Sequence, residues 1–152
     1  MPRHPSDSTE QLKAEAELIR KLNQRFNWNL SNHTVAPDGR SPLQLDGYSS
    51  TDRVICEAYA HIGKIIGAQY QKVLTDTLKL AYAEKLLCGK WRKVLLFADN
   101  EAARIFRSGT WYADVIREYG VEIEIVPLDT ESRQAVVEAQ KRQAMTNVGG
   151  GG

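Results

Sequence analysis

The stretch that decides the fold is LQLDGYSSTDRVICEAYAHI, residues 43–62. A short segment of alternating apolar and polar residues over 43–46 is followed by Gly, Ser and Asp residues and then by a longer segment over 53–62. Two such segments bounded by turn-forming residues are typical of β-strands, and so short a connection allows only antiparallel pairing. The sequence therefore predicts an antiparallel hairpin.

The chain after the hairpin changes its rhythm. Helical patterns alternate with short apolar runs, and Gly89 and Gly120 each follow a predicted helix, where a left-handed residue ends helices well. Strand–helix–strand units of this kind predict parallel pairing with right-handed crossovers. The expected elements are a helix over 68–87, a strand over 93–98, a helix over 101–119, a strand over 121–126 and a helix from 130 to about 145.

The segment before the hairpin begins with a helical pattern. The apolar residues Leu12, Ile19, Leu22 and Phe26 lie at helical spacing, which predicts a helix from Ser8 or Thr9 to about Arg25. Residues 27–42 are rich in Asn, Ser, Pro and Gly and are predicted to form a loop.

The whole pattern predicts one α/β domain over residues 10–146, with a mixed central sheet flanked by helices. Flexible tails are expected at 1–9 and, because the chain ends in four glycines, at 147–152.

Composition excludes several classes of protein. With 20 basic and 19 acidic residues in a chain of 152, the net charge of +1 excludes a uniformly basic nucleic-acid coat and an acidic disordered chain. Cys56 and Cys88 show no CxxC spacing, which argues against a disulfide framework and a thiolate zinc site. No apolar run approaches the roughly 20 residues of a membrane span. We expect a cytoplasmic protein without a membrane partner.

Two carboxylates stand out in the hairpin. Glu57 shares a strand face with Ile55 and Tyr59, and a carboxylate there is costly to desolvate unless something binds it. A buried salt bridge is one interpretation and a metal ligand is the other. Asp46 precedes Gly47, which alone indicates a turn. Because the two acids lie on consecutive strands, the pair predicts a site for Mg²⁺ or Mn²⁺ with open water positions.

Glu15 is a third candidate ligand. It lies on the stripe of the first predicted helix that otherwise carries apolar residues, between Leu12 and Ile19. A glutamate at the edge of the stripe, in solvent or paired with a lysine, is the alternative interpretation.

Cleavage of a phosphodiester also needs a cation near the phosphate. Lys72 is the first candidate, on the helix after the Glu57 strand and on the same stripe as Gln69 and Asp76. Lys64, in the preceding glycine-flanked connection, is the second, and solvated surface charge is the alternative for both lysines. Residues 61–93 hold seven basic residues against two acidic ones, which favours a polyanionic partner.

Asp46, the turn and Glu57 in mid-strand, followed by a helix and a strand, resemble the PD-(D/E)XK phosphodiesterase superfamily over residues 10–98. Asp46 matches the aspartate of the first half-motif, Glu57 the acidic residue of the second, and Glu15 the acid that some members carry on the first helix. The family places a lysine two residues after the second carboxylate, where this chain has Tyr59, and Leu45 stands where a proline is usual.

Lys72, with Gln69 one turn earlier, resembles the arrangement of members whose lysine comes from the following helix. The resemblance implies a restriction-endonuclease-like fold and a magnesium-dependent nuclease, a hydrolase acting on nucleic acid. Asp46, Glu57 and Lys72 would be catalytic, Asp46, Glu57 and Glu15 would bind the metal, and Lys64 and Gln69 would contact substrate, with DNA favoured over RNA.

Two other functions stay open. An inactive nuclease-fold scaffold, or a subunit of a nucleic-acid-processing complex, would need no lysine beside the carboxylates. A nucleotide-binding module of flavodoxin-like topology would have five parallel strands and no early hairpin. A homodimer or a partner protein is compatible with each of them.

Overall fold

The computed structural model describes residues 8–150 and the side chains of residues 8–146. Its centre is a five-stranded mixed sheet in which the strands lie in sequence order. The first three strands pair antiparallel and the last two join in parallel. These strands are β1 (Ser31–Val35), β2 (Leu43–Ser49), β3 (Val54–Tyr59), β4 (Arg92–Phe97) and β5 (Val121–Ile125). The predicted hairpin and mixed sheet are confirmed, and the flavodoxin-like order is excluded.

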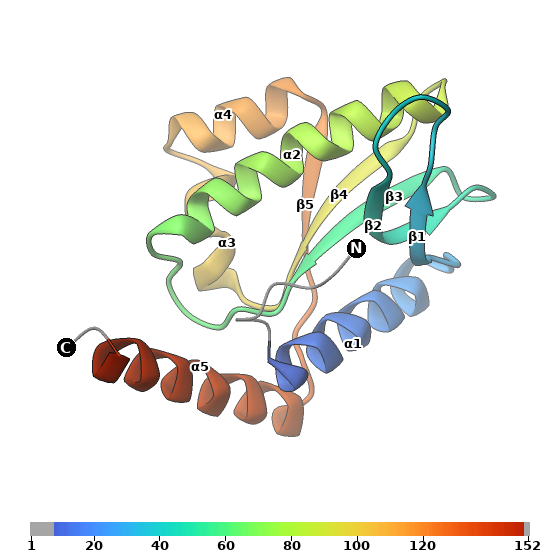
Figure 1. The fold of residues 1–152 in the computed structure, drawn as a ribbon. Helices are drawn as coiled ribbons and strands as arrows, with labels where there is room; N and C mark the ends of the chain where they lie inside the picture. Colours follow the sequence, from blue (N-terminus) through green and yellow to red (C-terminus); the bar gives the residue numbers. More distant parts are fainter. Residues whose placement is uncertain (1–7, 151–152) are drawn as a thin grey trace.

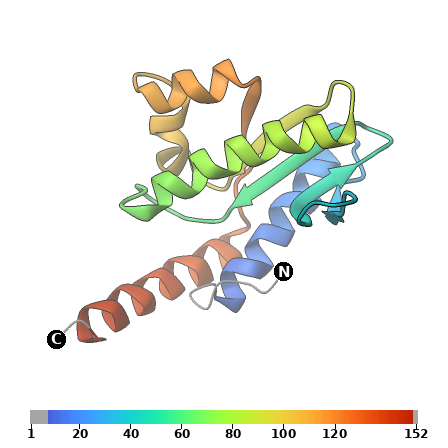
Figure 2. The same cartoon turned by 45° about the horizontal axis from the view of Figure 1, so that its top comes forward.

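Helices cover both faces of the sheet (Figures 1 and 2). On one face lie α1 (Thr9–Phe26) and α5 (Thr130–Gly150), and on the other lie α2 (Ala68–Leu87), α3 (Asn100–Arg107) and α4 (Trp111–Glu118). Leu96 packs into the first layer and its neighbour Leu95 into the second. β4 is therefore apolar on both sides, as expected of a strand that helices cover twice. Among residues 8–150, no helix has the length and apolarity to cross a membrane.

The predicted loop over residues 27–42 contains a strand, so that prediction is wrong in part. β1 has the sequence SNHTV and is largely exposed at the edge of the sheet. It lacks the alternation of apolar side chains that marks a half-buried strand, and its pairing with β2 makes it a strand.

Three predicted boundaries also differ from the structure. The helix expected over 101–119 is two helices, because Gly109 takes a φ of 78° between them and the hydroxyl of Thr110 caps α4. The strand expected over 53–62 ends at Tyr59. The backbone of α5 continues to Gly150, into the tail expected from residue 147. Residues 1–7 and 151–152, the outer parts of both expected tails, lie outside the described residues.

Asp46 lies in a strand as predicted, but Gly47 also lies within β2, at a β-bulge, and not in the predicted turn. Leu45 pairs with His33 and Tyr48 with Ser31, so β2 carries one more residue than β1 across this interval. Gly47 is needed for close approach, since a Cβ there would lie 3.2 Å from atoms of both Cys56 and Ile19. Asp46 lies next to Gly47, whose pairing with Cys56 ends the β2–β3 ladder.

Candidate functional site

Asp46 and Glu57 meet where the β2–β3 ladder ends. The last regular pair is Gly47 with Cys56, and Asp46 and Glu57 are the next residues on the two strands. Their side chains replace the missing ladder bonds. The backbone N–H of Asp46 donates to Glu57 Oε2 at 2.8 Å, and that of Ala58 donates to Asp46 Oδ2 at 3.0 Å. The structure thus brings the two predicted carboxylates together.

The lysine that contacts this pair is Lys79 of α2. Its Nζ donates to Glu57 Oε1, and the two side chains form an ion pair that is largely shielded from solvent. Lys72, the predicted lysine, is exposed two turns earlier on the same helix, with its Nζ 6.0 Å from the centre of the Tyr59 ring. Lys79, in place of Lys72, therefore joins the carboxylates.

Asp76 lies between these two lysines on α2 and is also buried. The hydroxyl of Tyr59, the residue at the position where the resemblance expects a lysine, donates to Asp76 Oδ2 at 2.8 Å. Lys72, Asp76 and Lys79 are separated by four and three residues, so they form one stripe of α2. Extending the stripe that carries Gln69, Lys72 and Asp76 by one step adds Lys79 as a candidate beside Lys72.

The cluster contains three carboxyl groups, those of Asp46, Glu57 and Asp76, and one lysine that contacts Glu57. Burial raises the pKa of Glu57 well above its usual range, and the charges of Asp46 and Asp76 add to this rise while Lys79 opposes it. Burial also raises the pKa of Asp76, against the hydrogen bond from Tyr59 and the charge of Lys79. A second cation at this place would relieve the repulsion among the three carboxylates.

Lys79 itself stays charged. Burial lowers the pKa of its ammonium, but the charge and hydrogen bond of Glu57 and the charges of Asp76 and Asp46 together outweigh burial. The net result is a raised pKa, so this lysine keeps its proton at neutral pH.

The donor set fits a hard divalent cation in part. Among the described residues, no group of three or more His, Cys, Asp or Glu side chains is arranged to hold a metal ion. Asp46 and Glu57 supply two carboxylates, and Mg²⁺ commonly uses one or two carboxylates and takes its other oxygens from water and substrate phosphate. Glu15, the third predicted ligand, lines a groove of about 240 Å³ together with Asp46.

The two predicted substrate-binding residues lie around His61. The side chain of Gln69 approaches His61 Nδ1 at 3.3 Å, and the carbonyl oxygen of Lys64 lies 3.2 Å from His61 Nε2. Lys64 is exposed in the connection between β3 and α2. Within the described part of the chain, neither residue has a hydrogen bond to Asp46 or Glu57.

Comparison with family models, with curated proteins and with solved structures gives no match for this chain. The functional interpretation of the site therefore rests on its own geometry and charge.

Proposed function

We propose that the protein is a phosphodiesterase, dependent on Mg²⁺ or Mn²⁺, that cleaves nucleic acid, and DNA in preference to RNA. The observation that carries this proposal is the meeting of Asp46 and Glu57 at the end of a strand ladder, with Lys79 bonded to Glu57. Two carboxylates and a charged lysine at one place are the groups that metal-assisted phosphodiester cleavage requires.

The order of elements supports a restriction-endonuclease-like fold. A helix, an antiparallel hairpin, a helix and a parallel strand follow one another from α1 to β4, which is the order that the resemblance to the PD-(D/E)XK superfamily implies. The missing lysine after Glu57 is then replaced by Lys79 from α2, in the manner of members whose lysine has moved to this helix.

Each residue has a separate role in this proposal. Asp46 and Glu57 would hold the cation, which when bound offsets the charge of the phosphate and lowers the pKa of a bound water. Lys79, held charged against Glu57, would offset negative charge that develops on the phosphate. Asp76 and Tyr59 join α2 to β3 one turn before Lys79 and so fix its position along the strand.

One observation favours the inactive scaffold as a second candidate. Both carboxylate oxygens of Glu57 already have partners within the protein, Lys79 and the N–H of Asp46. A scaffold would keep this network closed, whereas an enzyme would exchange one of these contacts for a cation.

A cleavage assay separates the two candidates. Single-stranded, double-stranded and branched DNA would be incubated with wild-type protein in Mg²⁺, in Mn²⁺ and in EDTA. Calorimetric titration of Mn²⁺ into wild type and into Glu57→Gln would measure binding independently of cleavage. The proposal expects metal-dependent cleavage, and Mn²⁺ binding that Glu57→Gln abolishes. A wild type that neither binds Mn²⁺ nor cleaves any substrate would identify the scaffold.

A further inference from the structure

A groove follows α1 from Asp46 to Trp28. Its first part, of about 240 Å³, contains Asp46 and Glu15, and its second part, of about 500 Å³, lies against the end of α1 and the loop that follows. Ala16 and Ile19 line both parts, so the two are continuous along the helix. The groove therefore connects the candidate site to the surface at the end of α1.

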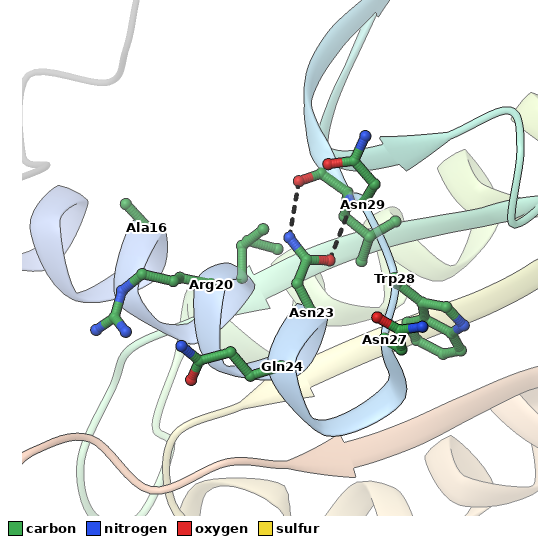
Figure 3. Close-up of a pocket in the computed structure, with 9 residues that line it drawn as sticks. Ala16, Arg20, Asn23, Gln24, Asn27, Trp28 and Asn29 are labelled. Carbon is green, nitrogen blue, oxygen red and sulfur yellow. Dashed lines mark hydrogen bonds between the residues drawn. The ribbon is translucent and has the colours of Figure 1, made fainter.

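The second part of the groove combines apolar residues with five polar ones, and none of its lining side chains is acidic. Arg20 and Gln24 lie one turn apart on the same side of α1 (Figure 3), and Asn27 and Asn29 follow in the loop. Within residues 8–146, none of these four side chains forms a hydrogen bond or an ion pair with the protein. Their donors and acceptors are available to a ligand.

The loop that presents these amides is fixed in place. Asn23 binds both backbone groups of Leu30, accepting from its N–H at 2.8 Å and donating to its carbonyl at 3.0 Å (Figure 3). The N–H of Asn29 donates to Asp52 at 2.9 Å, and Asn27 takes the left-handed conformation that ends α1. A ligand would thus meet amides that are already ordered, which lowers the entropy cost of binding.

We propose that this groove binds a single strand of DNA and leads it to Asp46. Amide side chains donate and accept together, and Asn and Gln are well matched to base edges, above all those of adenine. A single strand exposes edges that a duplex hides in base pairs. One arginine, Arg20, suits a phosphate contact, while the excess of amides over cations favours contact with bases over attraction to a duplex backbone.

The dimensions fit a short segment. From Leu12 to Gln24 the groove follows about 18 Å of helix, which equals about five nucleotides at the stacked spacing of a DNA strand. Bringing the strand to Asp46 rests on the proposed function, whereas the binding of the strand to the amides does not.

Binding is measured in EDTA by fluorescence anisotropy, with a labelled single strand of about ten nucleotides and with the duplex of the same sequence. Ala16 is exposed and lines both parts of the groove, so Ala16→Trp should obstruct it and weaken single-strand binding at least about tenfold. The double variant Gln24→Ala, Asn29→Ala should weaken it by about three- to tenfold. Arg20→Ala should reduce the slope of the logarithm of the binding constant against the logarithm of salt concentration by about 0.7.

Matched controls come from the opposite face of the sheet. Gln71→Ala on α2 and Arg104→Ala on α3 remove an exposed amide and an exposed cation far from the groove and should leave affinity unchanged. The inference is overturned if the duplex binds as tightly as the single strand, or if the groove variants bind as wild type does. If Ala16→Trp fails to fold by circular dichroism, the double variant decides alone.

The two proposals fail in different ways. If the groove variants leave both metal-dependent cleavage and single-strand affinity unchanged, the phosphodiesterase proposal stands and the groove proposal fails. If the groove variants lose single-strand binding but the wild type cleaves no substrate in any metal, the groove proposal stands and the phosphodiesterase proposal fails.

Discussion

Two lysine–glutamate pairs join α2 to the central sheet, and they differ in almost every other respect. In the candidate site the strand β3 supplies the acid, Glu57, and the helix supplies Lys79. Nearer the C-terminal end of α2 the roles are reversed, since β4 supplies Lys93 and the helix supplies Glu84, with 2.7 Å between Nζ and Oε1.

The second pair is balanced. Burial acts to raise the pKa of Glu84, but hydrogen bonds from Lys93 and from the backbone N–H of Trp91, together with the charges of Lys93 and Lys90, outweigh it, and the pKa is lowered. Around Glu57 the same kind of ion pair fails to lower the pKa, because burial is nearly complete and Asp46 and Asp76 lie close by.

A Lys–Glu contact alone therefore does not distinguish a structural pair from a functional one. The number of carboxyl groups around the lysine does distinguish them. Glu84 and Lys93 satisfy each other, and such a pair fits a role in joining helix to sheet. Glu57 is one of three neighbouring carboxyl groups with one lysine in contact, and a strongly raised pKa of this kind is typical of functional sites. The following predictions test this distinction.

The largest expected effect is that of Glu57→Gln. The amide keeps the shape of the side chain but lacks the charge that holds a cation, so cleavage should fall below detection, by about 10³-fold or more. Glu84→Gln makes the same chemical change in the balanced pair and should leave the rate within about twofold. Rates on the DNA substrate that wild type cleaves best, in Mn²⁺, provide the comparison. Equal losses in both variants would erase the distinction between the pairs.

Lys79→Ala should follow, with cleavage reduced by about 10²–10³-fold, since one preorganised charge at the site is lost. Lys72→Ala removes a charge from the same stripe without a contact to Glu57, and a loss below about tenfold is expected. Lys85→Ala, at an exposed position of α2, is the matched control and should match wild type. If Lys72→Ala reduces the cleavage rate more than Lys79→Ala does, Lys72 is the catalytic lysine and the assignment to Lys79 is wrong.

The two acids should also affect stability with opposite pH dependence. The folded pKa of Glu84 is lowered, so its contribution is present above the unfolded value of 4.5 and is lost as pH falls through the folded pKa. Glu84→Gln should therefore cost about 1 kcal/mol at pH 7, or about 2–4 °C in Tm, and progressively less as the medium becomes more acidic.

Glu57 has a raised folded pKa, so in EDTA its contribution is present below pH 4.5 and is lost as pH rises through the folded value. Thermal unfolding between acidic and neutral pH gives, for each Gln variant, the difference in Tm from wild type as a function of pH. Curves of the same sign would contradict the electrostatic distinction between the pairs.

Much of the fold could be predicted because its strong signals are local. The apolar run of β4 and the residues that cap the helices can be recognised in the local sequence, and the helix over 68–87 has the predicted limits. β1 could not be predicted, because its polar sequence becomes a strand through pairing with β2. Gly47 indicated a turn, while its actual role depends on the nearby Cys56 and Ile19, which no local pattern contains.

The candidate site divides in the same way. Asp46 and Glu57 could be chosen from the sequence because an antiparallel hairpin brings such positions to one place. Lys79 could not be separated from Lys72, since helical periodicity gives the stripe of α2 that faces β3 but not how far along β3 each turn of the helix lies. That position depends on the packing of α2 against the sheet, including the contact of Asp76 with Tyr59.

The smallest expected effect tests that contact. Tyr59→Phe removes the hydroxyl that donates to Asp76 and keeps the ring that packs against Phe97. The loss of one buried hydrogen bond should cost about 1 kcal/mol of stability. Because Tyr59 does not contact Glu57 through its hydroxyl, the cleavage rate should fall only by about two- to fivefold, through a looser position of Lys79.

The pH profile of cleavage separates a structural role of this contact from a positioning role. A purely structural role would lower Tm without moving the pH profile of cleavage. A positioning role should move that profile, since without the phenol Asp76 loses the hydrogen bond that lowers its pKa and becomes a weaker acid beside Lys79. Tyr48→Phe, at an aromatic position on β2 that stacks on Trp91 away from Asp76, is the control and should leave the pH profile unchanged. An unchanged profile in Tyr59→Phe would make this contact structural, like the Glu84–Lys93 pair.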